Sequence, residues 1–282
     1  AGTQGGKTWC GPISNGNQLM LFHNKALAPK APESTAELFE ICRGLKGRLK
    51  HCMALNLAAP FWLMPWLGAF GGWPMHKRTP TLNTPAMRGA IDFLIDIVYE
   101  RKLAPDECDY NCADVLFKEG KVAFIINGDW SISSYQEKFG KDLGVAKIPR
   151  LSKTGRWPSP MLSGSYFMLS SDLKGAKLDL ARSLVSFYTN EKNQIRQVEQ
   201  LKRLPALSAA TKAKIIQQDP ILAASMSQVL VGRPMPMALE MRAIWDAVRP
   251  SLGKALVRRI PVAEAAVRMQ LEAEEKIREM TD

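Results

Sequence analysis

The chain has 282 residues, of which 46% are hydrophobic and 23% charged, a balance that excludes disordered and fibrous proteins and suits one large or two modest cores. Lys and Arg number 38 against 27 Asp and Glu, which gives a formal charge of +11. The densest basic runs, 48–51 and Arg258-Arg259, lack the interleaved aromatic residues of a nucleic-acid surface, so we interpret the excess as solvated surface and expect no nucleic-acid partner.

Hydrophobic periodicity predicts strands and helices that alternate along the chain. Strands are expected at 18–22, 51–57, 121–126, 143–148 and 166–169. Helices are expected at 34–45, 84–99, 111–119, 178–188 and 191–200, and over most of the chain beyond 220, with a last helix from 261. This alternation favours an α/β domain with long helical tails.

Three helix ends carry capping residues. Ser34 followed by Glu37 matches a capping box, in which side chains satisfy the free backbone N–H groups of the first turn. Thr84 is an expected N-cap before Pro85, a residue that fits the first helical position. Gly120 is expected to end the helix at 111–119.

The sequence shows neither a membrane span nor a signal peptide. The richest apolar stretch, 58–70, is shorter than the ~18 residues of a span and contains two prolines. The first twelve residues, AGTQGGKTWCGP, have no apolar core of the signal-peptide kind. We expect that a targeting segment has been removed or that the chain begins partway through a longer protein.

Five cysteines leave at least one unpaired within the chain; they are Cys10, Cys42, Cys52, Cys108 and Cys112. The last two are separated by three residues with no histidine nearby, so zinc is not expected. A local disulfide in an oxidising compartment and free buried thiols both fit this spacing.

Residues for catalysis are sparse. His23, His51 and His76 have no helix-spaced partner for a metal. The chain contains no GxSxG, no P-loop and no GxGxxG motif, and nothing assembles a nucleophile, a base and an orienting group. We therefore expect no enzyme activity, no metal and no cofactor.

Several of the seven tryptophans stand in turn-like contexts. Trp62 follows Pro60-Phe61, Trp73 lies between glycine and proline, and Trp130 follows Gly128-Asp129. An aromatic ring on a loop can stack on the C–H face of a sugar while polar neighbours bond its hydroxyls. Taken one at a time, such rings more often fill the core.

One segment of the chain, LFKEGKVAFIINGDW at 116–130, is close to the pattern F-x-x-G-x-x-A-M-x-I-x-G-x-W. Six further segments accompany it, at 11–27, 31–40, 56–72, 203–207, 232–236 and 244–252. In their order and spacing along the chain, these seven segments resemble the family 1, or maltose-binding-protein-like, extracellular solute-binding proteins.

The resemblance implies a type II periplasmic-binding-protein fold, with two α/β lobes joined by crossover strands and closing on ligand like a hinge. It places a nearly complete second lobe at 13–162 plus 220–282. Remnants of the first lobe would lie at 1–12 plus 165–215, because most of that lobe precedes the resembling segments in family members.

The resemblance also implies a set of ligand-binding residues. Trp130 and Trp245 match rings that stack on sugar in the maltose-binding member, Arg249 matches a cleft arginine, and Phe61 replaces a cleft tyrosine beside Trp62. Asn15 or Asn17 could bond sugar hydroxyls. Ala59 stands where the maltose-binding member has a glutamate, so the resemblance does not extend to maltose itself.

The expected function is capture of a small, sugar-like solute for the membrane permease of an ABC importer, by a monomer in the periplasm or outside the cell. A missing N-terminal segment could anchor it to the membrane. Two alternatives are kept: the same fold binding an anionic solute such as a glycerol phosphodiester, and a carbohydrate-active enzyme, which would need two carboxylates across a sugar site.

Overall fold

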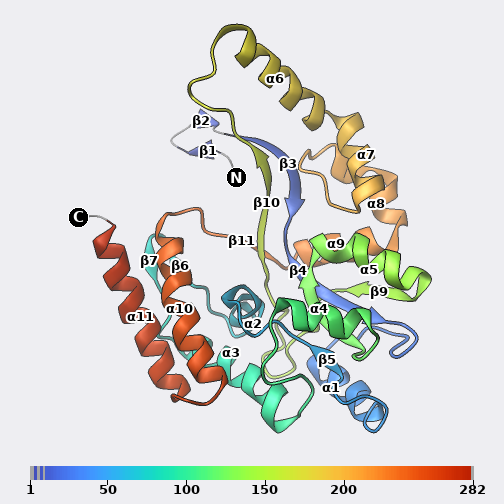
Figure 1. The fold of residues 1–282 in the computed structure, drawn as a ribbon, viewed down its shortest axis with the longest axis vertical. Coiled ribbons are helices and arrows are strands. Elements are labelled where there is room, and N and C mark those ends of the chain that lie inside the picture. The colour runs from blue at the N-terminus through green and yellow to red at the C-terminus, as the bar shows by residue number, and fades with distance from the viewer. Residues whose placement is uncertain (1–2, 5–6, 9, 281–282) are drawn as a thin grey trace.

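The computed structural model describes residues 3–4, 7–8 and 10–280. A larger body with one central sheet is joined by two long strands to a smaller part that carries helices α6 and α7 (Figure 1). In the described residues no helix is both long and apolar enough to cross a membrane.

The central sheet has four strands in the order β5-β8-β4-β9. Their bounds are Met53–Ala54, Phe124–Gly128, Leu19–Asn24 and Leu143–Ala146. β4 is antiparallel to both β8 and β9, and β5 is parallel to β8. Every residue of β4 and β8 is buried, because helices cover both faces of the sheet.

Alternate residues of the strands enter two different cores. Leu19 and Leu21 of β4 belong to a large core, whereas Met20 and Phe22 belong to a smaller one. The large core is formed with α1 (Thr35–Gly44), α2 (Met64–Ala69), α3 (Pro85–Ile95), α10 (Glu240–Leu256) and α11 (Val262–Glu279). The smaller core is formed with α4 (Tyr110–Lys118) and α5 (Ile132–Phe139).

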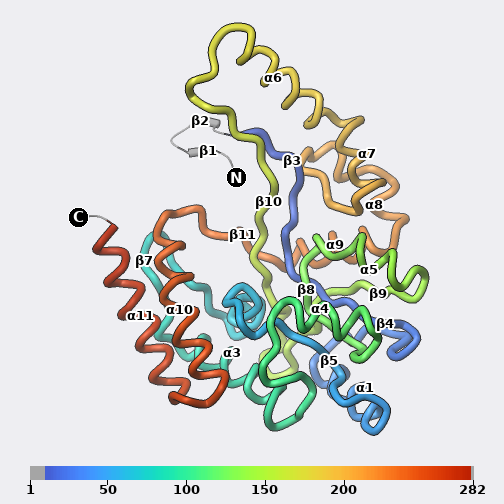
Figure 2. The backbone as a smooth tube through the Cα atoms, viewed as in Figure 1, coloured from blue at the N-terminus to red at the C-terminus, as the bar shows by residue number. Residues whose placement is uncertain are grey.

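Two strands connect the body to the smaller part. β3 (Gly11–Gly16) and β10 (Met161–Phe167) pair antiparallel, with Ser163 opposite Gly16, and the short β11 (Arg233–Pro234) pairs with the other edge of β10. Figure 2 shows the two long strands running side by side between the parts. They have the position expected of crossover strands.

The smaller part contains the hairpin of β1 (Thr3–Gln4) and β2 (Lys7–Thr8), and the helices α6 (Gly175–Thr189) and α7 (Glu191–Leu201). α8 (Lys214–Gln218) and α9 (Pro220–Val229) lead back to the body. α6 has no buried residue, and its Leu180 and Phe187 are 74% and 60% exposed.

Short elements complete the described part. The hairpin β6 (Met75–His76) and β7 (Thr79–Pro80) lies beside α11, and a π-helical turn at Asp96–Glu100 continues α3. Single 3-10 turns lie at Pro60–Trp62, Asp129–Ser131, Gly140–Asp142 and Ala210–Lys212.

Three predicted strands differ from the structure. The strand expected at 51–57 is reduced to the two residues of β5, because its pairing with β8 covers Met53 and Ala54; beyond it the Asn56 side chain accepts the Ala58 N–H at 3.1 Å. The strand at 121–126 lies further on, at β8, since Leu19 pairs with Gly128. The strand at 166–169 begins earlier, at β10, because the polar residues before it pair with β3.

The predicted helix caps are present. Ser34 accepts the Glu37 N–H at 3.2 Å, although the Glu37 carboxylate accepts from Glu33 rather than from Ser34. Thr84 accepts the Met87 N–H at 3.2 Å. Gly120 follows α4 with a φ of +69°, a conformation that favours glycine.

A Thr84→Ala substitution should lower the free energy of unfolding by about 1 kcal/mol, because it removes the acceptor for an N–H of the first turn of α3. Urea unfolding followed by far-ultraviolet circular dichroism measures the loss. Thr84→Ser keeps the hydroxyl and should stay close to the parent chain, so an equal loss in both variants would contradict a capping role.

The structure contains two disulfides, Cys42–Cys52 and Cys108–Cys112, and Cys10 is free. Of the two alternatives for the local cysteine pair, the structure therefore has the disulfide. The pairing of Cys42 with Cys52 had no signal in the sequence, since one lies in α1 and the other just before β5.

Candidate ligand-binding site

Four of the predicted site residues meet in one aromatic cluster on the large core. Phe61 and Trp62 come from the turn before α2, Trp130 from the turn after β8, and Trp245 from α10. The centroid of Phe61 lies 5.8 Å from that of Trp62 and 6.4 Å from those of Trp130 and Trp245. We call these four rings the aromatic wall. All four are half-buried, so each keeps surface that a ligand can contact.

Hydrogen bonds fix two of the three indoles of the wall, those of Trp62 and Trp130. Trp62 Nε1 donates to the carbonyl oxygen of Ile126 in β8 at 2.8 Å, and Trp130 Nε1 donates to the Tyr110 hydroxyl at 3.2 Å. The Trp130 ring also lies over Gly128, where a Cβ would come within 2.2 Å of it. The glycine of the family-like pattern is therefore required by this close approach.

Asn17 lies at the junction between β3 and β4, beside the aromatic wall. Its backbone N–H donates to Asp129 Oδ2 at 3.2 Å, and its side-chain amide donates to Ser163 Oγ at 2.8 Å. Gly16 and Asn17 have φ values of +133° and +50°, so the chain bends sharply there. Asn17 is exposed. Because it follows β3 directly, its two hydrogen bonds link the residue before Trp130 to both crossover strands.

Asn15 and Arg249 are also exposed, but the structure does not bring their side chains into the aromatic cluster. Asn15 is part of β3, and its backbone N–H donates to the Leu204 carbonyl at 3.1 Å. Arg249 follows Trp245 by about one turn of α10 and forms none of the ion pairs found in the described residues. Its guanidinium is thus free to bind a ligand group.

Asp129 directly precedes Trp130 of the wall, and it is only 5% exposed. Burial raises its pKa to about 6, against the opposing effects of the N–H bonds from Asn17 and Trp130 and of the Arg203 charge. A glycosidase would need a second carboxylate facing it across a sugar. Asp246, which follows Trp245 directly, lies exposed on α10.

Two residues of the site were missed by the sequence analysis. Tyr110, at the start of α4, contacts Trp130 and has its ring centroid 6.0 Å from that of Trp62. Its only signal was its place between Cys108 and Cys112. The second is Asp129, whose carboxylate accepts from the backbone N–H of Asn17, a residue distant in sequence.

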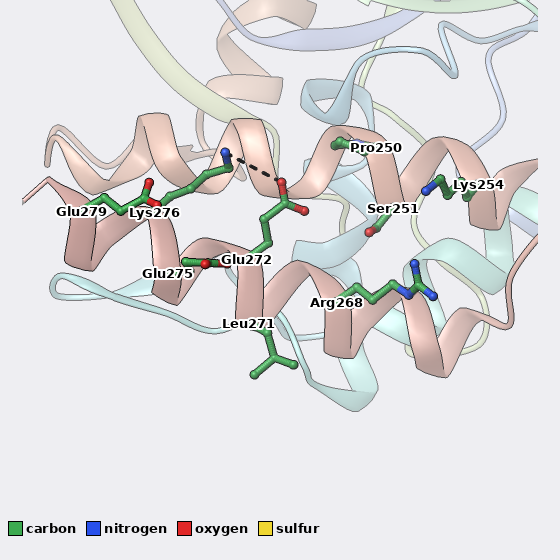
Figure 3. A pocket seen from close by; sticks show the side chains of 9 residues that line it. All are labelled: Pro250, Ser251, Lys254, Arg268, Leu271, Glu272, Glu275, Lys276 and Glu279. Carbon is green, nitrogen blue, oxygen red and sulfur yellow. Dashed lines mark ion pairs between the residues drawn. The ribbon is translucent and has the colours of Figure 1, made fainter.

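A hollow elsewhere in the body does not suit the same ligand. It lies between α10 and α11 (Figure 3), has a volume of about 550 Å³, and is lined mostly by charged residues, with no aromatic ring in its lining. On its α11 side Lys276 Nζ lies 3.9 Å from Glu272 Oε1, one turn earlier in the same helix. Within the described part of the chain, no group of three or more His, Cys, Asp or Glu could hold a metal ion.

An α/β body joined by paired strands to a smaller part, with an aromatic wall near the junction, defines the class of hinged binding proteins. The chain belongs to the bacterial extracellular solute-binding protein family, whose model matches residues 1–224. The family inferred from the resemblance is thereby confirmed, and its members are carriers without enzyme activity.

The chain is 30% identical to a galactooligosaccharide-binding protein of Bacillus subtilis over 83% of this chain and 58% of that protein. It is 28% identical to a maltotriose-binding protein of Pyrococcus abyssi, over 84% of this chain and 53% of that protein. The chain thus spans little more than half the length of these relatives.

Among solved structures, the chain is similar to the maltose/maltodextrin-binding domain MalE from Bdellovibrio bacteriovorus bound to maltotriose. The TM-score is 0.88 and the identity 34%, over 99% of this chain and 75% of that one. This likeness confirms the expected binding-protein fold, of mixed α and β structure.

Proposed function

We propose that this chain provides the oligosaccharide-binding surface of the substrate-binding protein of an ABC importer. The observation that carries the proposal is the aromatic wall, because four half-buried rings from three separate segments meet in one place. Sugars have apolar C–H faces that pack on such rings. The relatives that bind maltotriose and galactooligosaccharides agree with this chemistry.

Polar groups around the wall would supply orientation. Asn17 and Asn15 are exposed on the strand leading to the wall, and Arg249 is exposed on the helix that carries Trp245. Amide and guanidinium groups both donate to sugar hydroxyl oxygens. Because Ala59 offers no carboxylate acceptor, we expect binding to depend more on stacking than on charged hydrogen bonds.

The proposed second lobe comprises 13–162 plus 220–282, and the proposed first-lobe remnants are 1–12 plus 165–215, although 1–2, 5–6 and 9 lie outside the described residues. The exposed apolar face of α6 supports this division, since Leu180, Leu184 and Phe187 are the kind of side chains that pack against further structure. The protein would act as a monomer at the extracellular or periplasmic side of a membrane permease. A membrane anchor would be a feature of the whole protein.

Titration of intrinsic tryptophan fluorescence tests the function. Maltose, maltotriose, a galactooligosaccharide and glycerophosphoglycerol are added in turn to the chain. A saturable change with an oligosaccharide is the expected result, because three of the four wall rings are tryptophans. Unchanged tryptophan fluorescence with every sugar would contradict the proposal.

An anionic ligand is the second candidate, and one observation favours it. Arg249 is exposed without an ion-pair partner in the described residues, on a chain of net charge +11. An arginine of this kind can bind phosphate through two N–H groups. Saturation by glycerophosphoglycerol alone, with a steep decrease in affinity as salt is added, would select this candidate over the sugar.

A further inference from the structure

Tyr110 is the central residue of a small closed loop. The disulfide Cys108–Cys112 joins two cysteines four residues apart, with Tyr110 midway between them. The loop is held by one bond from outside and one from within, because the Cys108 carbonyl accepts the Leu57 N–H at 2.9 Å and the Asp109 side chain accepts the Cys112 N–H at 2.8 Å. Few conformations are therefore open to the backbone that carries the tyrosine.

The Tyr110 side chain connects this loop to the aromatic wall. Its hydroxyl accepts the Trp130 Nε1–H at 3.2 Å and lies 3.4 Å from Ser131 Oγ, while its ring meets Trp62 edge-on. The indole of Trp130 has one hydrogen-bond donor, and this hydroxyl satisfies it. Moving Tyr110 would release Trp130 to other rotamers.

We propose that the Cys108–Cys112 disulfide is a positioning element of the ligand wall: it holds Tyr110 so that its hydroxyl fixes the ring of Trp130. The disulfide acts through Tyr110 and does not touch the ligand. The consequence for affinity rests on the proposed function, but the state of the Trp130 indole can be measured without any ligand.

The second disulfide separates positioning from general stabilisation. Cys42–Cys52 has a sequence separation of 10, so its loss should destabilise the chain at least as much as loss of Cys108–Cys112, whose separation is 4. It lies away from the wall along the sheet. The Cys52 carbonyl accepts the N–H groups of Ala123 and Phe124 at the beginning of β8, whereas Trp130 follows the other end of that strand.

The first experiment follows the indole N–H signals of the ligand-free chain by ¹H–¹⁵N NMR, with Trp130 assigned through a Trp130→Phe variant. Tyr110→Phe removes the hydroxyl alone and should shift the Trp130 signal and speed its exchange with solvent. The double variant Cys108→Ala with Cys112→Ala should do the same, and Cys42→Ala with Cys52→Ala should leave the signal in place. An unmoved Trp130 signal in the Cys108/Cys112 variant, or an equal change in the control, would overturn the proposal.

The second experiment measures affinity for maltotriose by calorimetry. Tyr110→Phe and the Cys108/Cys112 double variant should each bind about fivefold more weakly, which corresponds to one hydrogen bond. Combining them should give no further loss, since both act through one hydroxyl. Additive losses of affinity in the combined variant would overturn the proposal that the disulfide acts through the Tyr110 hydroxyl. If the parent chain does not bind maltotriose, the proposed ligand fails, and the NMR exchange alone decides the positioning role.

Discussion

A Trp130→Ala chain is expected to bind maltotriose on the order of 30-fold more weakly than the parent chain. Trp130 contacts two other rings of the wall, with its centroid 6.3 Å from that of Trp62 and 6.4 Å from that of Phe61. Its indole is held by Tyr110 and Gly128, so it is ordered before a ligand arrives. Isothermal titration calorimetry is the appropriate measurement, because the substitution removes a fluorophore.

Two further variants give this prediction its controls. Trp157 is also half-buried, but its ring lies against Lys147, with Nζ 3.5 Å from the ring centroid, and in the described residues it makes no ring contact with the wall. Trp157→Ala should leave the affinity within about twofold, which is less than a single hydrogen bond. Gly128→Ala keeps the Trp130 indole but displaces it, and should cost about tenfold. Equal losses in Trp130→Ala and Trp157→Ala would show that Trp130 has no special role.

The buried strands and capped helices of this fold are predictable because local sequence specifies them. β4 contains an unbroken apolar run, and Thr84 with Pro85 marks the beginning of α3 through a side-chain acceptor and a fixed φ. The crossover strand β10 was placed too late because Ser163, Gly164 and Ser165 interrupt its apolar pattern before Tyr166. Its pairing with β3, about 150 residues earlier in the chain, depends on contacts that local pattern does not report.

The aromatic wall was accessible through the resemblance, whereas its supports were not. Phe61, Trp62, Trp130 and Trp245 lie in family-like segments and form one cluster in the structure, while their role in binding stays a prediction. The Tyr110–Trp130 and Asn17–Asp129 contacts join residues that are 20 and 112 positions apart in the chain. No sequence periodicity links residues at such separations. The residues that position the wall therefore had to come from the structure.

Asp129→Asn is expected to stabilise the chain above pH 6 by up to about 3 kcal/mol and to have little effect at pH 4. The folded pKa of Asp129 is about 6 against a reference of 3.8, chiefly because burial penalises the charged carboxylate. Each unit of pKa shift corresponds to about 1.4 kcal/mol. Between the reference pKa and the folded pKa, the folded chain binds more protons than the unfolded chain. The stability of the parent chain therefore decreases as pH rises through this range.

Urea unfolding at pH 4, 5, 6 and 7.5 would measure this difference between the parent chain and Asp129→Asn. The asparagine keeps an oxygen that can accept the Asn17 N–H, so the substitution removes the charge and retains the contact. A constant difference across the series would mean that the carboxylate does not titrate in this range.

Asp219→Asn is the matched control and should behave in the opposite sense. Although burial raises its pKa, the hydrogen bond from Lys202, those from the N–H groups of Leu222 and Ile221, and the Lys202 charge together lower it. A lowered pKa stabilises the folded chain above the reference pKa, and that stability is lost as pH falls through the folded pKa. Asparagine can still cap α9, so Asp219→Asn should reduce stability at pH 7.5 and converge with the parent chain in acid. The two variants together distinguish two kinds of carboxylate. Asp129 is buried beside the aromatic wall and lowers the stability of the chain, whereas Asp219 raises it through its ion pair.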